Sequence, residues 1–198
     1  MSGVTRGHGY LEGFLARQRC RKANALISPE RRTGRLLDIG CGTFPLFLTR
    51  CSFAAKYGLD KVVDKDAPGI DGDLQLLNFD VEREDRLPFE DEFFDVVSAL
   101  AVFEHIEPDR LVQLTAEIRR VLKPQGQYVM TTPSSWTGGI LSTMARLRLV
   151  SSEEIDEHKD AYSRSQILSV LERAGFLPDR TRSGHFELFM NTWVVAAK

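Results

Sequence analysis

The sequence predicts an α/β protein built on a doubly wound, mostly parallel β-sheet. Short apolar runs alternate with helical patterns along most of the chain, which is the order expected when helices connect parallel strands. The run at 93–103 is apolar at successive positions, as in a central strand that helices bury on both faces. A turn with two glycines follows the first run, and ligands bind such sheets beyond the carboxyl ends of the strands.

The strands are expected at the apolar runs, each of which is flanked by turn residues or acids. The first five cover 34–40, 54–60, 74–80, 93–103 and 127–133. Residues 177–198 then supply two closing strands. The Lys-Pro-Gln-Gly sequence at 123–126 predicts a turn before the fifth strand.

Helices are expected where apolar residues recur at helical spacing. Leu111, Leu114 and Ile118 predict a helix over 108–122, and Pro108 stands in its first turn, where a missing amide proton costs little. Gly175 marks the end of another helix. The other expected helices lie near 45–52, over 163–175 and in an N-terminal helical segment, 1–34.

The organisation indicates one domain over residues 1–198, because a chain of this length supports one substantial core. Residues 133–162 do not follow the rhythm of the sheet: they combine small residues, a short apolar stretch and a charged loop. We therefore interpret 133–162 as an insertion.

The composition, 42% hydrophobic and 27% charged, is typical of a soluble globular protein. No run approaches the roughly 18 apolar residues that a transmembrane helix needs, and the first residues lack the apolar stretch of a secretory signal. The three cysteines have no metal-like spacing, and their odd number argues against a disulfide framework. These features predict a cytoplasmic protein.

The charge pattern argues against a nucleic-acid interface. Residues 1–35 carry eight Lys and Arg against two Glu, whereas residues 80–109 carry eleven Asp and Glu against two Arg. The basic residues fall on the polar side of an expected helix, and no aromatic residues interleave with them as in a single-strand binder. A solvated helix surface explains them better.

The segment 36–50, LLDIGCGTFPLFLTR, predicts a nucleoside-binding loop. Gly40 and Gly42 let the backbone turn sharply and approach a ligand closely. Asp60 follows Gly40 by twenty residues, at the end of the second strand, where an acid accepts hydrogen bonds from ribose hydroxyls. Either a nicotinamide dinucleotide or an isolated adenosine would use these features.

Pro45 distinguishes the two ligands. A pyrophosphate binds free backbone N–H groups at a helix N-terminus, and proline removes one of these donors and obstructs close strand–helix packing. Phe44 adds bulk beside it. The loop therefore favours an adenosine with an uncharged or positive substituent, and an NAD-dependent oxidoreductase is the weaker alternative.

Several segments of the chain resemble the motifs of one protein family and occur in the same order. LLDIGCGT is similar to motif I of the class I S-adenosylmethionine-dependent methyltransferases, with Phe44 at the third glycine position of acidic-x-Gly-x-Gly-x-Gly. The further similar segments are GLDKV, NFDVEREDRLPFEDEFFDVVSALAVFEHI, VLKPQGQYVMTTP and YSRSQILSVLERAGF. The resemblance covers most of 35–176. It implies a Rossmann-like doubly wound sheet of seven strands with helices on both faces, the last strand antiparallel.

The resemblance implies a cofactor, S-adenosyl-L-methionine, with S-adenosyl-L-homocysteine as the product. Asp38 would orient the amino group of the methionyl part, Asp60 would hold the ribose hydroxyls, and Asp80 would accept from the adenine amino group. The alternative for each acid is structural: a cap for the turn, an exposed turn acid, or part of the charged run at 80–85. The other implied cofactor-binding residues are Gly40, Cys41, Gly42, Lys61, Val81, Leu100 and Ala101.

The segment VFEHI supplies the candidate catalytic pair. A hydroxyl acceptor needs a base within hydrogen-bond reach, and the ordinary pKa of histidine suits His105 to that role. Glu104 would orient the imidazole; the alternative is that the two residues only cap the loop before Pro108. Similar ubiquinone-pathway O-methyltransferases carry Glu-x-x-Glu-His as metal ligands, but Ala101 replaces the first acid here, so no metal is predicted.

The leading function is methylation of a small-molecule acceptor, with O-methylation favoured. The insertion and the N-terminal helix are expected to cover the acceptor, which the apolar stripe Ile140, Leu141, Met144 and Leu147 suggests is apolar or lipid-linked. A packed helix explains the stripe as well. The alternative function is a non-catalytic S-adenosylmethionine-binding module of the same fold, because the cofactor residues alone do not distinguish binding from turnover.

Overall fold

The computed structural model describes residues 12–64, 73–134 and 162–198. The apolar stripe at 140–147 and almost all of the insertion expected at 133–162 lie outside these residues, as do the first eleven residues of the expected N-terminal segment.

The centre of the fold is a seven-stranded sheet with the order β3-β2-β1-β4-β5-β7-β6. The first five strands are parallel to one another, and β7 lies between β5 and β6 and runs antiparallel to both. The mostly parallel sheet with an antiparallel last strand is confirmed. The strands are β1 (Arg35–Ile39), β2 (Ala55–Asp60), β3 (Leu74–Asn78), β4 (Phe94–Leu100), β5 (Leu122–Pro133), β6 (Thr181–Phe186) and β7 (Asn191–Ala197).

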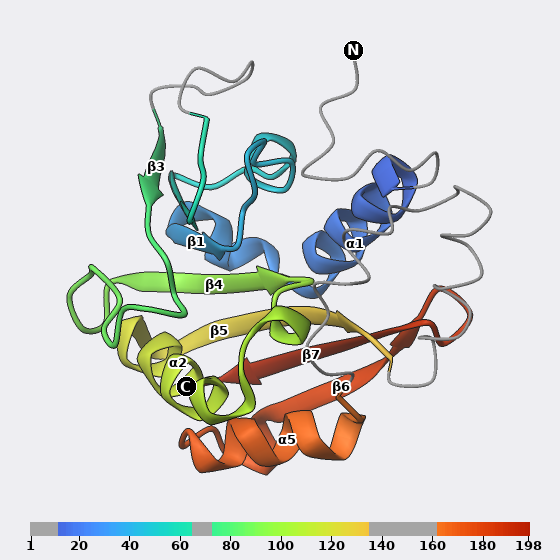
Figure 1. Ribbon diagram of the computed structural model, residues 1–198. Coiled ribbons are helices and arrows are strands. Elements are labelled where there is room, and N and C mark those ends of the chain that lie inside the picture. The colour runs from blue at the N-terminus through green and yellow to red at the C-terminus, as the bar shows by residue number, and fades with distance from the viewer. Residues whose placement is uncertain (1–11, 65–72, 135–161) are drawn as a thin grey trace.

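Helices cover both faces of the sheet (Figure 1). Helix α1 (Glu12–Leu26) packs on one face, while α2 (Pro108–Val121) and α5 (Arg164–Arg173) lie on the other. Alternation along each strand divides the core, because successive side chains point to opposite faces. Leu36 and Val96 face α1, whereas Leu37 and Val97 face α2 and α5. None of the described helices has the length and apolar character of a bilayer span.

The helix expected near 45–52 is the main difference from the sequence prediction. The structure forms only a single 3-10 turn at Leu48–Arg50. The four residues at 45–48 are all buried, and a single helix face cannot bury four residues in a row. The segment therefore folds as a tight turn inside the α1-side core, and Cys51 returns to extended backbone.

The expected turn at 123–126 lies inside β5 as a bulge. Leu122 pairs with Phe94 and Gln127 pairs with Val96, so the register shifts between them. Gln125 has a positive φ of 63°, and its N–H donates to the carbonyl of Lys198. The Lys198 carbonyl, which follows β7, thus accepts the hydrogen bond of a bulge residue that has no partner on β4.

The α5 helix begins and ends as the sequence predicts. Ser163 caps its N-terminus and forms a capping box with Gln166. Gly175, with a φ of +93°, follows its last turn.

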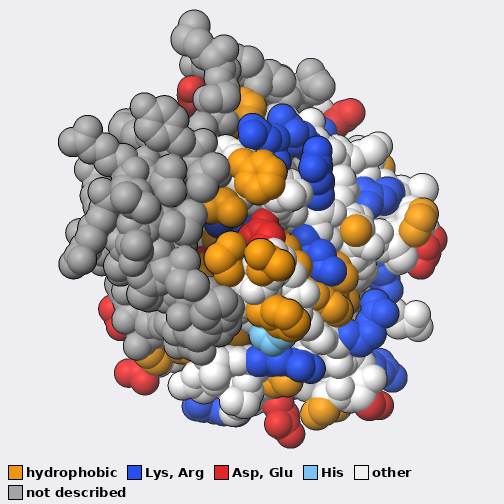
Figure 2. Space-filling model, turned by 90° about the vertical axis from the view of Figure 1, so that its right-hand side faces the viewer, with side chains coloured by type: hydrophobic (Ala, Val, Ile, Leu, Met, Phe, Trp, Pro, Cys, Tyr) orange, Lys and Arg blue, Asp and Glu red, His pale blue; other side chains and the backbone are white. Residues whose placement is uncertain are grey.

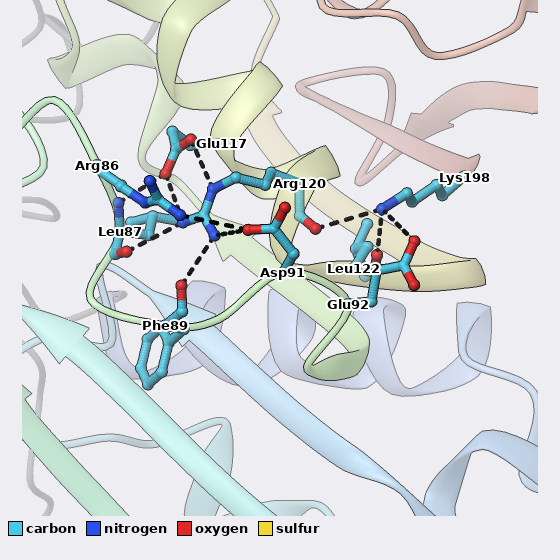
Figure 3. Close-up of polar contacts among 9 residues, drawn as sticks. All are labelled: Arg86, Leu87, Phe89, Asp91, Glu92, Glu117, Arg120, Leu122 and Lys198. Carbon is cyan, nitrogen blue, oxygen red and sulfur yellow. Dashed lines mark hydrogen bonds and ion pairs between the residues drawn. The ribbon is translucent and has the colours of Figure 1, made fainter.

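A polar network attaches the loop before β4 to α2 (Figure 3). The Arg120 guanidinium donates to Glu117 and Asp91 and to the carbonyls of Leu87 and Phe89. These hydrogen bonds lower the pKa of Asp91. Lys198 closes the other end of the network through the Leu122 carbonyl. The network holds the Leu-Pro-Phe segment, whose Phe89 ring packs edge-on against Phe94 at 4.8 Å.

Replacing Tyr128 with Phe is expected to raise the free energy of unfolding by about 1 kcal/mol. The Tyr128 hydroxyl is buried and has no hydrogen-bond partner among the described residues, while its ring stacks on Phe176. Urea denaturation measures the change. Tyr162→Phe is the matched control, because the Tyr162 hydroxyl donates to the Ile106 carbonyl and its loss should lower stability. A less stable Tyr128→Phe variant would contradict the assignment.

Candidate functional site

The site lies at the carboxyl ends of β1 and β4, where the strand order reverses. Gly40 and Gly42 follow β1 with φ angles of +69° and +75°, which L-residues rarely adopt. A Cβ atom on Gly40 would come within 2.4 Å of Val102 Cγ2, so the loop also needs glycine for the close approach of the chain beyond β4. The N–H groups of Gly40 and Cys41 donate to the Leu59 carbonyl.

Asp60 connects this loop to the end of β2. Its Oδ2 accepts from the Gly42 N–H at 3.0 Å, and its Oδ1 accepts from the Val62 N–H at 3.0 Å. The carboxylate is buried, whereas the neighbouring Lys61 is exposed. The acid and the glycine loop therefore meet as the twenty-residue spacing predicts.

Asp38 is buried on the α1 side of β1 and is held by Ser98. The Ser98 hydroxyl lies 2.7 Å from Asp38 Oδ1 and donates to it. Burial raises the pKa of Asp38 to about 7, with the Ser98 hydrogen bond opposing the rise and Asp60 adding to it. Sequence reasoning missed Ser98. It is the one hydroxyl in the run at 93–103, and it pairs with Asp38 across β1 and β4.

Asp80 lies two residues beyond β3 and caps a turn. Its Oδ1 accepts from the Glu82 N–H at 3.0 Å, and its backbone carbonyl accepts from Arg83 and Glu84. Arg110 of α2 holds this turn through the Glu84 carbonyl at 2.8 Å. Sequence reasoning missed Arg110, because nothing local relates a helix residue to a turn so far from it in the chain.

The chain beyond β4 turns abruptly at Ala101. Its φ of +57° is unusual for alanine, and its N–H donates to the Thr131 carbonyl at 2.8 Å. This turn leads Val102 over Gly40 and begins a 3-10 helix at Phe103–His105. Leu100 and Ala101 are partly exposed beside the glycine loop.

Glu104 and His105 differ in burial. Glu104 is buried, and its Oε2 accepts from the Thr132 hydroxyl at 2.9 Å. Its Oε1 is also buried and has no hydrogen-bond partner among the described residues. His105 is half-buried. Thr132 of β5 thus holds one oxygen of the Glu104 carboxylate. That Glu104 orients the imidazole stays a prediction.

The site carries no cluster typical of a metal centre. Over 12–64, 73–134 and 162–198, no group of three or more His, Cys, Asp or Glu side chains could hold a metal ion. Metal independence stays a prediction.

Without a ligand, the protein is expected to lose stability as the pH rises between the unfolded and the folded pKa of Asp38. The folded-state pKa of about 7 exceeds the unfolded value of 3.8, so the proton binds the folded state more tightly. The stabilisation of the fold by the Asp38 proton, about 4 kcal/mol in total, is fully present below the unfolded pKa and is lost by about pH 7. Urea denaturation of the wild type and of Asp38→Asn across this range measures it. Parallel pH profiles for the two proteins would refute the assignment to Asp38.

Comparison with known proteins agrees with this arrangement. A family model described as a methyltransferase domain matches residues 11–179. None of the curated proteins compared with the chain matches it.

Solved structures show the same fold. An S-adenosylmethionine-dependent methyltransferase from Mesorhizobium loti has a TM-score of 0.68 and 18% identity, over 90% of this chain and 96% of that one. One from Archaeoglobus fulgidus has a TM-score of 0.68 and 18% identity, over 93% and 94%. Phosphoethanolamine N-methyltransferase 2 from Haemonchus contortus, in complex with S-adenosyl-L-methionine, has a TM-score of 0.65 and 14% identity, over 91% and 52%. With the family model covering most of its length, the chain belongs to the methyltransferase domain family.

Proposed function

We propose that the protein is an S-adenosylmethionine-dependent methyltransferase that acts on a small-molecule acceptor, with O-methylation favoured. The observation that carries the proposal is the pair of buried acids beside the glycine loop, Asp38 and Asp60. Asp38 has a raised pKa and lies in apolar surroundings, and such a carboxyl gains most from a cationic partner. The ammonium group of the cofactor's methionyl part is such a partner.

The residues around the loop fit the rest of the cofactor. Asp60 accepts hydrogen bonds from the ribose hydroxyls, and its bond to Gly42 holds it at the loop. Asp80 and the Val81 amide face the adenine, on the turn that Arg110 secures. Leu100 and Ala101 line the sulfonium side. Gly40, Cys41 and Lys61 complete the binding set that the family resemblance implies.

The backbone after the loop also favours this cofactor over NAD. A dinucleotide places its pyrophosphate on the N-terminus of the helix that follows the loop. Here a single 3-10 turn follows, beginning at Leu48, and Pro45 contributes no N–H. The segment therefore lacks the helix N-terminus on which an NAD-dependent oxidoreductase binds the pyrophosphate of its cofactor.

The bound cofactor supplies a methyl group on a positively charged sulfur, which is a good leaving group. The protein aligns the acceptor with that group and excludes water, and such positioning lowers a barrier by roughly 7–11 kcal/mol. His105 accepts the proton of an acceptor hydroxyl at one of its ring nitrogens. Glu104, which precedes His105 in the 3-10 helix, accepts a hydrogen bond from the Thr132 hydroxyl.

We propose an apolar or lipid-linked acceptor, a cytoplasmic location and one methyltransferase domain over 1–198. The family match over 11–179 supports the single domain. The cysteines Cys20, Cys41 and Cys51 are free thiols, which a reducing compartment maintains. Residues 133–162, which we expect to cover the acceptor, lie outside the described residues apart from their ends.

Asp60→Asn is expected to weaken S-adenosylmethionine binding about tenfold to a hundredfold, because it removes a charged acceptor. Isothermal titration with S-adenosylmethionine and with NAD measures both affinities. Asp179→Asn, an exposed acid before β6, is the matched control and should bind normally. Wild-type protein that binds NAD and ignores S-adenosylmethionine would rule out the proposed cofactor.

His105→Ala is expected to lower turnover about 10²–10⁴-fold while leaving the affinity for S-adenosylmethionine unchanged. Formation of S-adenosylhomocysteine in the presence of a metabolite extract measures turnover. His185→Ala, which changes an exposed histidine of β6, is the control. Unchanged turnover in the His105→Ala variant would exclude His105 as the base. If the wild type formed no product with any extract, the alternative of a non-catalytic S-adenosylmethionine-binding module would be favoured.

A further inference from the structure

The turn between β6 and β7 exposes two large apolar side chains. Leu188 is 87% exposed and Phe189 is 67% exposed. Both residues and the preceding Glu187 have positive φ angles of 50–67°, a conformation that L-residues rarely adopt. The Phe189 ring packs against the His185 ring at 5.6 Å, and Leu188 is the most exposed large apolar side chain among the described residues.

The tip lies at the same edge of the sheet as the candidate site. Strand β7 begins at Asn191, opposite Pro133 at the carboxyl end of β5. The Ser134 N–H also donates to the Met190 carbonyl at 2.8 Å. The apolar tip therefore projects from the edge where the parallel strands end.

Three basic side chains lie near β6, β7 or the turn that joins them. Arg19 of α1 is close enough to act on the Glu187 carboxyl, and Lys22 Nζ lies 4.7 Å from the Trp193 ring on β7. Arg164 of α5 donates to Ser183 on β6 at 2.7 Å. Figure 2 shows this side of the molecule, with Lys and Arg side chains bordering hydrophobic ones.

The acid within the turn is directed inward. Glu187 is half-buried, and its Oε2 accepts from the Asn191 side chain. Burial raises the pKa of Glu187, and the charge of Arg19 opposes the rise. The most exposed side chains of the tip, Leu188 and Phe189, are apolar, and basic side chains of α1 and α5 lie near the strands that carry the tip, although the whole chain has a net charge of −2.

We propose that the β6–β7 tip, Leu188 and Phe189, inserts into the interface of an anionic lipid bilayer while Arg19, Lys22 and Arg164 contact the headgroups. Apolar side chains entering the headgroup boundary next to basic residues are the usual pattern of such binding. A stable protein interface needs about 800 Å² on each partner, which two protruding side chains do not supply. The proposal concerns the surface alone and does not rest on methyl transfer.

Docking at this tip turns the carboxyl edge of the sheet toward the lipid. An acceptor with a lipid tail could then reach the candidate site while its tail stays in the bilayer.

Vesicle sedimentation tests the proposal. Wild-type protein is expected to sediment with vesicles of phosphatidylcholine mixed with phosphatidylglycerol, and to stay in solution with phosphatidylcholine alone or at high salt. The double variant Leu188→Ser, Phe189→Ser is expected to lose at least about tenfold in partitioning. The matched control is Leu177→Ser, which removes an exposed apolar residue before β6, at the opposite edge of the sheet, and should bind like the wild type. Circular dichroism verifies that each variant is folded.

A fluorescent label gives an independent readout. Leu188→Cys carrying an environment-sensitive dye should shift its emission to the blue with anionic vesicles, and Leu177→Cys should not. The native cysteines are buried, and burial raises the pKa of Cys20 and Cys51 to about 12, so the dye reacts at the new thiol.

Several outcomes would overturn the proposal. These are no sedimentation of the wild type with anionic vesicles, equal binding by the tip variant, or an unshifted label at position 188. Sedimentation velocity adds one more: a wild-type dimer that the tip variant converts to a monomer, without vesicle binding, would assign the tip to a second copy of the chain. Titration with S-adenosylmethionine is unaffected by any of these results, so a failure here is distinct from a failure of the proposed function.

Discussion

The hydrogen bond between the Gly42 N–H and the Asp60 carboxylate links two of the strands that carry the candidate site. It ties the loop after β1 to the end of β2, and the Val62 N–H holds the same carboxylate from the other side. The chain beyond β4 closes over this loop, because Val102 lies against Gly40. Three connections therefore meet at one point. A side chain at Gly40 would separate them, since no space for a Cβ exists there.

The same point carries a cost to stability. Asp38 is buried beside the loop with the Ser98 hydroxyl hydrogen-bonded to it, and burial raises its pKa. Core positions of this kind usually hold apolar residues, and departures from that rule concentrate at functional sites. Ala101 adds a second departure through its left-handed backbone. Both lie at the reversal of strand order, whereas two apolar clusters fill the core on either face of the sheet.

The surroundings of the site are held by long-range polar contacts. Arg120 fixes the loop before β4, and Arg110 fixes the turn that contains Asp80. Each joins α2 to a segment about 25 to 30 residues earlier in the chain. These contacts attach the Asp80 turn and the Leu-Pro-Phe segment to one helix, so the position of that turn depends on α2. The β6–β7 tip instead projects from the edge of the sheet, where Arg19 of α1 acts on the Glu187 carboxyl.

The sequence by itself determined the sheet, the glycine loop and the acids at the strand ends, because alternation, glycine and the spacing from Gly40 to Asp60 are local signals. It also marked the capped start of α5 at Ser163. Only the tertiary structure decided that residues 45–52 form one 3-10 turn, that Glu104 binds Thr132, and that Ser98 supports Asp38. Each of these depends on which strands are neighbours, and strand pairing brings together residues that no local pattern connects.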